Sequence, residues 1–416
     1  MKSKLLILSL CIVVFFVSCE VKKTDGDKTK SVLMDLVTTS PQAFYHSILK
    51  AFDNTEEANK PELADSIYKI AKQNQWIPIV FADTAVFIYK GSSEGLSVKI
   101  AGDMTAWNPS ISLSSVGGTS LYLGVYKAPS KETRVDYKIV INSKDWILDP
   151  GNPKKQMSGF GYNSELALSE YVYSDWIKER NDGQKGTLSG NILIASEALG
   201  YDVNYKIYLP AGYDSSKIYP LLVTTDGHEY SSKEMGSLTI VADNMINDNK
   251  IDPVIIVFVD PRDPKNHASN RRMIEYAGND KFAVFLAEEL MSELKANYSI
   301  AGTPDQTAIL GTSMGGLISA FIGISYPHVY GLVAIQSPAF KHWTAIYSYY
   351  ETSPAVDLKI YMDTGVIQDT QEAALKMKGI LDKKGYVLHY AEYFEGHSWG
   401  SWRARMDEVL EYFFGK

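Results

Sequence analysis

The sequence predicts an α/β domain with a doubly wound, mostly parallel sheet, preceded by an all-β sandwich and a short helical hairpin. Three observations support this fold class. Residues 41–75 carry apolar side chains at helical spacing, residues 76–170 change to the period of two that is typical of strands, and strand-like runs alternate with helical ones from residue 189 onward. Such an alternation is the pattern of a parallel sheet covered by helices.

Length and composition limit the class of protein. The chain has 416 residues, enough for two or three domains, and its 45% hydrophobic and 22% charged residues are typical of soluble globular proteins. The net charge of −8, from 41 basic and 49 acidic residues, argues against nucleic acid as a partner, because no basic stripe is present to neutralise phosphates. The sequence has no HExxH motif and no cluster of histidine and acidic residues, so we expect neither a metal nor another cofactor.

The N-terminus has the features of an export signal. Two lysines precede the apolar run 5–17, which is followed by Ser18 and Cys19. Residues 1–19 resemble a bacterial lipoprotein signal, in which the cysteine is lipidated and becomes the new N-terminus; an uncleaved membrane anchor is the alternative. The resemblance implies export and a lipid anchor at Cys19 in the bacterial outer membrane, on its periplasmic or its surface face. The second cysteine, Cys11, also lies in the signal, so the mature chain would contain no disulfide.

A tether and a helical hairpin are expected next. The polar, charged residues 20–40 are predicted to link the lipid to the fold. Ser40 and Pro41 suit the N-cap and the first turn of a helix. Two amphipathic helices then form the hairpin over residues 41–75.

Short alternating runs separated by glycine, serine and asparagine turns predict a β-sandwich over residues 76–170. Within it, Ala101–Trp107 and Trp146–Pro153 are similar to the immunoglobulin-like "early set" module found beside glycan-acting enzymes. Trp107 is then either a sugar-stacking platform or a packed residue, the commoner role of such aromatics. A charged linker over residues 171–188 marks the domain boundary.

The α/β domain, residues 189–416, carries the motif Gly311-x-Ser313-x-Gly315 between a strand-like run and an apolar helix opener. This is the pattern of a nucleophile elbow, a sharp strand-to-helix turn that exposes a serine hydroxyl and needs small residues where the backbones approach. The helix N-terminus adds a positive dipole end where negative charge develops. A bare GxSxG also arises by chance, so its strand and helix context is what predicts a nucleophile at Ser313 and an α/β-hydrolase fold.

Chain order indicates the partners of the serine. In this fold the nucleophile is followed by the acid and then by the histidine, which selects His397 because it follows the last strand. The acid is expected after the strand that ends at Met362, where Asp363 and Asp369 both qualify. Asp369 is preferred because it lies further along the loop, whereas Asp363 suits a turn. The predicted triad is therefore Ser313, His397 and Asp369.

The oxyanion hole and the substrate pocket have weaker signatures. Two backbone N–H groups are expected to hold the oxyanion, one from Met314 and one near His228 in the loop after the strand 221–225. Four aromatic residues on loops that follow strands form either an aromatic substrate pocket or part of the core. They are Phe340, Trp343, Trp399 and Trp402.

Five segments occur together and in order in this domain: Leu222–Gly227, Arg272–Glu275, Phe285–Leu290, Gly311–Gly316 and Gly396–Arg403. Their combination is similar to the "putative esterase" family of α/β-hydrolases, which includes enterochelin esterases, feruloyl and acetyl-xylan esterases and mycolyltransferases. The resemblance covers residues 191–414 and implies a serine ester hydrolase. The family's aspartate usually follows the loop glycine by three residues, whereas Asp369 follows Gly365 by four. Arg272 and Glu275 are expected to form a structural pair, with a substrate-side role for Arg272 as the alternative.

The sequence thus predicts a serine carboxylic-ester hydrolase that works through an acyl-enzyme on an aromatic or carbohydrate-linked ester. The alternatives are an acetyl-xylan-type esterase and a glycan-binding lipoprotein whose hydrolase domain is inert. The ending Trp399–Arg403 favours the enterochelin-type branch. The net charge disfavours an anionic ferric siderophore, and a lipoprotein signal beside a glycan-type module favours esters on plant polysaccharide.

Overall fold

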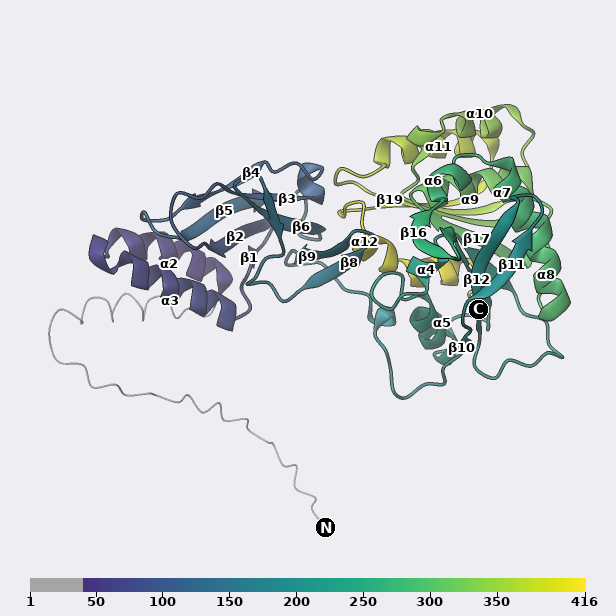
Figure 1. Ribbon diagram of the computed structural model, residues 1–416, viewed down its shortest axis with the longest axis horizontal. Helices are drawn as coiled ribbons and strands as arrows, with labels where there is room; N and C mark the ends of the chain where they lie inside the picture. Colours follow the sequence, from purple (N-terminus) through teal and green to yellow (C-terminus); the bar gives the residue numbers. More distant parts are fainter. Residues whose placement is uncertain (1–39) are drawn as a thin grey trace, which may run out of the picture.

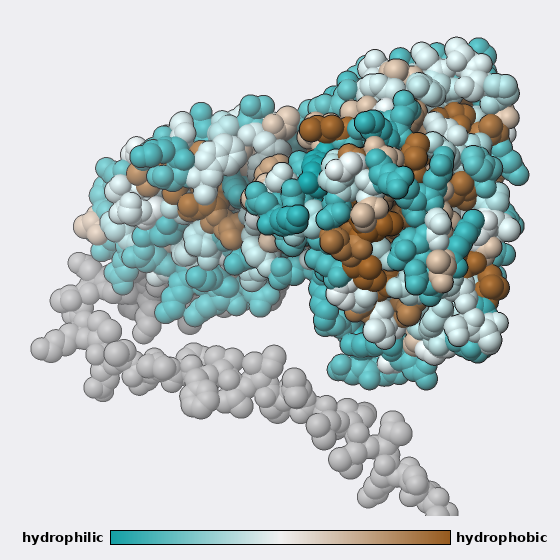
Figure 2. Space-filling view, turned by 45° about the vertical axis from the view of Figure 1, so that its right-hand side comes forward, coloured by the Kyte–Doolittle hydropathy of each residue, from teal (hydrophilic) through white to brown (hydrophobic). Residues whose placement is uncertain are grey.

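The computed structural model describes residues 40–416. The predicted signal with Cys19, and residues 20–39 of the tether, lie outside the described residues. The described chain forms two lobes, an N-terminal lobe (residues 41–167) and an α/β lobe (residues 187–416), joined at a waist (Figures 1 and 2). On the face that Figure 2 shows, both lobes are mostly hydrophilic, and hydrophobic side chains gather in separate patches on each of them. Within residues 40–416, no helix combines the length and the apolar character that crossing a membrane requires.

The N-terminal lobe begins with the two predicted helices, α2 (Pro41–Asp53) and α3 (Lys60–Gln73). The N-cap of α2 is Ser40, whose hydroxyl accepts a hydrogen bond from the N–H of Ala43 at 3.2 Å. The buried faces of both helices share one hydrophobic cluster with the first two strands of the lobe. The hairpin is thus held by packing on the sheet.

The strands of this lobe pair antiparallel in the order β1-β2-β5-β4-β3-β6-β9-β8, with β7 paired to β6. Their bounds are β1 (Ile79–Phe81), β2 (Thr84–Lys90), β3 (Val98–Gly102), β4 (Ile111–Ser115), β5 (Leu121–Lys127), β6 (Arg134–Ile141), β7 (Asp145–Ile147), β8 (Lys155–Ser158) and β9 (Gly161–Ala167). Successive side chains of a strand point to opposite faces. Accordingly, Val86 and Ile88 of β2 pack under the helices, whereas Ala85 and Phe87 join the core between the two halves of the sheet. The likeness to an immunoglobulin-like module remains a prediction.

The α/β lobe contains a second sheet, in the order β10-β12-β14-β13-β17-β18-β19-β20, with β11 paired to β12. Its strands are β10 (Thr187–Leu188), β11 (Ile192–Ser196), β12 (Tyr201–Leu209), β13 (Leu221–Thr224), β14 (Ile255–Asp260), β17 (Thr307–Thr312), β18 (Leu332–Gln336), β19 (Lys359–Gly365) and β20 (Val387–Tyr393). The strands from β14 to β20 in this order pair parallel. Strand β12 pairs antiparallel with β10, β11 and β14. The last two residues of the predicted linker 171–188 pair with β12 as β10, and the linker itself remains a prediction.

Helices cover both faces of this sheet (Figure 1). They are α4 (Gly227–Tyr230), α5 (Leu238–Asn247), α6 (Arg272–Glu275), α7 (Asp280–Val284), α8 (Leu290–Asn297), α9 (Met314–Ser325), α10 (Ala345–Thr352), α11 (Gln371–Lys384), α12 (Trp399–Arg403) and α13 (Met406–Phe414). Alternate residues of β13 enter different cores: Leu221 and Val223 pack with α9, and Leu222 packs with α5 and α13. A small hairpin, β15 (Arg262–Asp263) and β16 (Asn266–Asn270), stands apart from the sheet.

The order of the parallel strands decides where polar residues meet. Strands β17, β18, β19 and β20 are consecutive in the chain and adjacent in the sheet. The carboxyl ends of parallel strands lie at the same edge, where sites form in such sheets. The loops after these four strands, which carry Ser313, Ser337, Asp369 and His397, are therefore neighbours.

Candidate active site

The three residues predicted as a triad lie in hydrogen-bond contact. The Nε2 atom of His397 is 3.0 Å from the Oγ atom of Ser313. Its other ring nitrogen, Nδ1, is 2.6 Å from the Oδ1 atom of Asp369. Ser313 lies between β17 and α9, Asp369 between β19 and α11, and His397 between β20 and α12. Their order in the chain matches the expected one.

The turn at Ser313 has the strained backbone of a nucleophile elbow, with φ 58° and ψ −117°. Neighbouring segments hold it in place, since its N–H donates to the carbonyl of Gln336 and its carbonyl accepts from the N–H of Ala339, both at 2.9 Å. Its flanking glycines leave no space for a side chain. A Cβ atom at Gly311 would lie 2.1 Å from the carbonyl oxygen of Gly315, and one at Gly315 would lie 2.4 Å from Oγ1 of Thr225.

We expect Gly311→Ala to lower the free energy of unfolding by about 3 kcal/mol, because the atom that the methyl group meets is backbone and cannot rotate away. Urea denaturation of the purified variant measures the loss. The matched control is Gly379→Ala in α11, where an added Cβ meets nothing within 4 Å and should be neutral or slightly stabilising. Equal stabilities for the two variants would contradict the close approach at the elbow.

Asp369 is held as a buried carboxylate. Its side chain is fully buried, and its Oδ2 atom accepts hydrogen bonds from the N–H of Gly365 at 2.7 Å and from the hydroxyl of Ser337 at 2.6 Å. Burial alone would raise the pKa of Asp369, but the hydrogen bonds from His397, Ser337 and Gly365 together hold that pKa below its ordinary value. An ionised Asp369 keeps the proton of the neutral imidazole on Nδ1 and leaves Nε2 free to accept.

Asp363, the alternative acid, does not reach the histidine. Its side chain is buried in the core beside β18, where the Oδ2 atom accepts a hydrogen bond from the side-chain amide of Gln336 at 3.1 Å. Burial raises the pKa of Asp363 to about 7. The geometry therefore selects Asp369 as the partner of His397.

The raised pKa of Asp363 predicts that the stability of the fold depends on pH. The folded state binds the Asp363 proton more tightly than the unfolded state, where the pKa is about 3.9, so this stabilisation is complete at low pH and is lost as the pH rises towards 7. Between pH 5 and pH 8 the loss is about 3 kcal/mol, at about 1.4 kcal/mol per pKa unit. We expect Asp363→Asn to remove that part of the fall. Urea denaturation of parent and variant at both pH values tests this, and parallel slopes would contradict it.

The two tryptophans after His397 are buried, with exposed fractions of 2% for Trp399 and 7% for Trp402. The Trp402 ring meets the imidazole of His397 edge-on at 4.9 Å, and its N–H donates to Ser337 Oγ at 2.9 Å. Trp399 packs edge-on against Trp402 and donates to Glu229 at 3.2 Å. Of the two roles expected for these indoles, the structure shows the packing role, because packing leaves them almost no exposed surface.

The other predicted pocket residues also pack. Phe340 is fully buried, and the half-buried Trp343 meets Phe321 edge-on at 5.2 Å beneath Gly278. Part of Trp343 stays exposed, so among the four aromatic residues only Trp343 keeps a contact with substrate as a prediction.

Arg272 and Glu275 do not pair with each other, contrary to the prediction. Arg272 forms a two-pronged ion pair with Asp226, at 3.0 and 2.9 Å, whereas Glu275 accepts a hydrogen bond from the hydroxyl of Tyr201 at 2.7 Å. The N–H of Asp226 donates to the Tyr276 hydroxyl at 2.9 Å. Arg272 therefore fixes the loop between β13 and α4, on the side of the molecule where the oxyanion donors are expected.

The two predicted oxyanion donors begin helices at this edge. Met314 is the first residue of α9 and His228 the second of α4, so their N–H groups have no acceptor within the helix. The parallel pairing of β13 with β17 brings these helix starts together. The His228 imidazole lies 3.4 Å from Asp260, and burial lowers its pKa, so at neutral pH it is uncharged.

Ser337 is a site residue that sequence reasoning missed. It links Asp369 to Trp402 by accepting from the indole and donating to the carboxylate. Its position directly after β18, between the nucleophile strand and the acid strand, was a usable signal.

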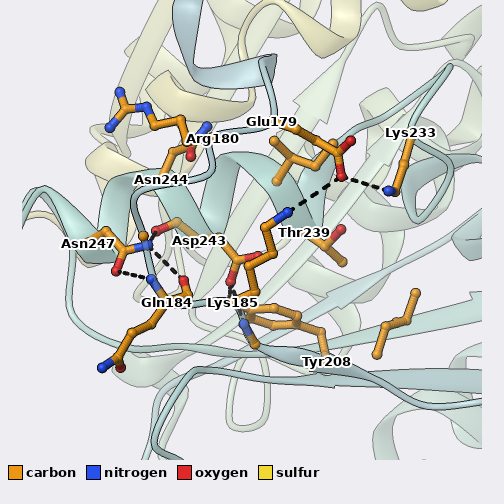
Figure 3. A pocket seen from close by; sticks show the side chains of 14 residues that line it. Glu179, Arg180, Gln184, Lys185, Tyr208, Lys233, Thr239, Asp243, Asn244 and Asn247 are labelled. Carbon is orange, nitrogen blue, oxygen red and sulfur yellow. Dashed lines mark hydrogen bonds and ion pairs between the residues drawn. The ribbon is translucent and has the colours of Figure 1, made fainter.

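A cavity of about 170 Å³ lies between the linker and α5 (Figure 3). Lys185 and Lys233 both pair there with Glu179, and Asn247 binds the backbone of Gln184. Ser313, Asp369 and His397 are not among its lining residues. Within residues 40–416, no group of three or more His, Cys, Asp and Glu side chains is placed to hold a metal ion.

Solved structures share this fold. Enterobactin esterase from Shigella flexneri superposes with a TM-score of 0.65 over 79% of this chain and 92% of its own, at 18% identity. Ferric enterobactin esterase from Salmonella typhimurium gives a TM-score of 0.67 at 17% identity, over 79% of this chain and 93% of its own. The fold and the site together define an esterase of the α/β-hydrolase type.

The family assignment is direct. Residues 196–413, more than half of the chain, match the family model described as "Putative esterase", and the chain belongs to that family. It is a carboxylic ester hydrolase.

Relatives in sequence have diverse names. The Bacillus subtilis (strain 168) protein "Uncharacterized protein YjcH" is 24% identical over 229 residues, 52% of this chain and 93% of that protein. "Endo-1,4-beta-xylanase/feruloyl esterase" of Xylanibacter ruminicola is 27% identical over 39% of this chain and 23% of its own. "Iron(III) enterobactin esterase" of Escherichia coli O6:H1 is 26% identical over 47% of this chain and 46% of its own. The matches therefore span less than half of either named esterase.

Proposed function

We propose that the protein is a serine esterase that cleaves an aromatic or carbohydrate-linked ester through an acyl-enzyme. The observation that carries the proposal is the continuous hydrogen-bond chain from Asp369 through His397 to Ser313, with distances of 2.6 and 3.0 Å. An activated nucleophile needs a base within such reach and a third group that orients the base.

The proposed reaction has two halves. The hydroxyl of Ser313 attacks the ester carbonyl while His397 Nε2 takes its proton, and the buried Asp369 stabilises the resulting imidazolium. The N–H groups of Met314 and His228 stabilise the oxyanion, at about 3 kcal/mol for each donor in comparable sites. His397 then protonates the leaving alcohol. Water, deprotonated by His397, hydrolyses the acyl-enzyme and restores Ser313.

The rival function is a glycan-binding lipoprotein with an inert hydrolase domain. An inert domain does not require a buried carboxylate that is hydrogen-bonded to a histidine, nor a histidine that contacts a serine at a strand-to-helix turn. Asp369, His397 and Ser313 keep that arrangement here, which favours the enzyme.

Substrate class is proposed from the relatives. The two named relatives above are a feruloyl esterase and an iron(III) enterobactin esterase by name. Feruloyl esters carry an aromatic ring on the acyl group, and enterobactin carries its catecholate rings on amides of the serine units that form its esters, whereas acetyl esters carry no ring. We therefore place aromatic acyl esters ahead of acetylated xylan.

The experiment compares turnover of methyl ferulate, ferric enterobactin and acetylated xylan by the purified protein, and follows the enzyme by mass spectrometry after rapid acid quench. Hydrolysis of an aromatic substrate with an acyl adduct on the peptide that contains Ser313 is the expected result. Turnover of acetylated xylan alone would replace the aromatic assignment, and failure on all three substrates would overturn the proposal.

We also propose, from the sequence of residues 1–19, that the protein is exported and anchored by lipid at Cys19 in a bacterial outer membrane. Incorporation of radiolabelled palmitate by the parent chain but not by Cys19→Ala is the expected result. Equal labelling of both chains would contradict the anchor.

A further inference from the structure

The N-terminal lobe contacts the loop that carries His397. In Figure 1, β6, β8 and β9 lie beside α12 at the junction of the lobes. The N–H of Arg134, the first residue of β6, donates to the carbonyl of Phe394 at 3.0 Å, and Arg134 forms a parallel bridge with Glu395. A strand of one lobe thus continues the backbone pairing of β20 two residues before the histidine.

The Arg134 side chain enters the other lobe. Its guanidinium is buried and is paired within its own lobe to Asp136 at 2.7 Å and to Glu165 at 2.8 Å. The remaining nitrogen, Nη1, donates to the hydroxyl of Ser398 at 2.9 Å, directly after His397. The contact is close, since a Cβ atom at Gly400 would lie 2.0 Å from the Arg134 Cζ atom.

A second residue supports the loop from the other side of the histidine. Asp103 lies against Gly396, where a Cβ atom would be 2.3 Å from the Asp103 side chain. The Asp103 carboxylate is itself fixed, because it accepts from the N–H of Asp136 at 2.8 Å and from the indole of Trp107 at 3.1 Å. Trp107 thus helps to hold Asp103 and stays partly exposed, and a sugar-stacking role for its ring remains a prediction.

The acid loop belongs to the same assembly. Ile367 is buried in the core of the N-terminal lobe, with Val366 packed against that core. The N–H of Ile367 donates to the carbonyl of Glu395 at 3.0 Å. The loops that carry Asp369 and His397 are thus joined to each other and to the N-terminal lobe.

We infer that Arg134 is a positioning residue for ester hydrolysis and that the N-terminal lobe completes the catalytic site by holding the His397 loop against Ser313. The inference rests on the proposed function. Proton transfer requires His397 Nε2 at hydrogen-bond distance from Ser313 Oγ, and a displacement of about 1 Å lowers a rate by roughly 10²-fold. Substrate binding at the ester does not require this contact, so the effect belongs in kcat and not in KM.

The test uses two variants of the full chain. Ser398→Ala removes the hydrogen bond that crosses the lobes and leaves the Arg134 ion pairs with Asp136 and Glu165 in place. Arg134→Met removes the guanidinium, and Arg134→Lys restores a cation of lower reach. We expect kcat to fall about 10²-fold in Arg134→Met, less in Ser398→Ala and Arg134→Lys, with KM unchanged within about twofold. Covalent labelling of Ser313 by a fluorophosphonate should slow by the same factors.

Ile48→Ala is the matched control. Ile48 is fully buried in the helical hairpin cluster, so its truncation destabilises the same lobe without changing a contact to the His397 loop. Its folded fraction should retain the parent kcat. The inference is overturned if Ser398→Ala and Arg134→Met both keep the parent kcat and labelling rate. It is also overturned if Ile48→Ala loses as much kcat as these two variants. If instead Ser313→Ala hydrolyses ester as fast as the parent, the proposed function itself fails, and this result distinguishes that outcome from a failure of the positioning role alone.

Discussion

Replacing Ser313 with alanine is expected to lower kcat for ester hydrolysis by about 10⁶-fold, the size of loss seen when another serine hydrolase loses its nucleophile. The hydroxyl that would attack the carbonyl is gone, whereas the predicted oxyanion donors are backbone groups and remain. Within residues 40–416 the Ser313 hydroxyl makes one hydrogen bond, to His397, so its loss should leave the thermal melt nearly unchanged. Steady-state turnover of p-nitrophenyl acetate and calorimetry measure the two effects.

Two further variants make this test specific. Ser319 lies in the same helix, and its buried hydroxyl has no hydrogen-bond partner among residues 40–416, so Ser319→Ala is expected to keep the parent activity. The double variant of Ser313→Ala and His397→Ala should be no slower than either single one, because residues that act as a unit give non-additive losses. Retained turnover in Ser313→Ala would mean that another group is the nucleophile.

The sequence was informative about the α/β lobe because its signals are local. The strand, turn and helix around Ser313 are consecutive, and the apolar helix expected directly after the motif is α9. The chain order of Ser313, Asp369 and His397 then translated into space because β17 to β20 are consecutive neighbours in the sheet. A sheet with a different strand order would have separated the same three residues.

Contacts between distant segments were not predictable in the same way. Arg134 and Ser398 are 264 positions apart, and no periodicity in either segment indicates the other. Arg272 was paired with Glu275 on proximity in the chain, but its partner is Asp226, 46 positions away. The loop position of Trp399 and Trp402 left a pocket role and a core role open, whereas in the structure both indoles are buried. Loop residues are hard to place because their burial depends on tertiary packing.

The choice between the two aspartates makes the second large prediction. Asp369→Asn is expected to lower kcat by about 10⁴-fold, as the equivalent change does in a serine protease triad. An asparagine can turn its amide nitrogen toward His397 Nδ1, which would then have to accept a hydrogen bond. The imidazole proton would move to Nε2, and that nitrogen could no longer take the proton of Ser313.

Asp363→Asn is the matched control, since it makes the same chemical change in β19, just before the loop that carries Asp369, and Asp363 does not contact the histidine. Its kcat should stay within about twofold of the parent. The pKa of Asp369 is held below its ordinary value of about 3.9, so in the parent this carboxylate stays ionised at every pH above that value. Protonation of Asp369 therefore cannot account for a loss of activity between pH 5 and 8. Measurement of kcat for both variants across this range separates the two residues. A large loss in Asp363→Asn with an active Asp369→Asn would mean that the histidine takes its acid from the strand end, which requires a rearrangement of the loop around Gly365.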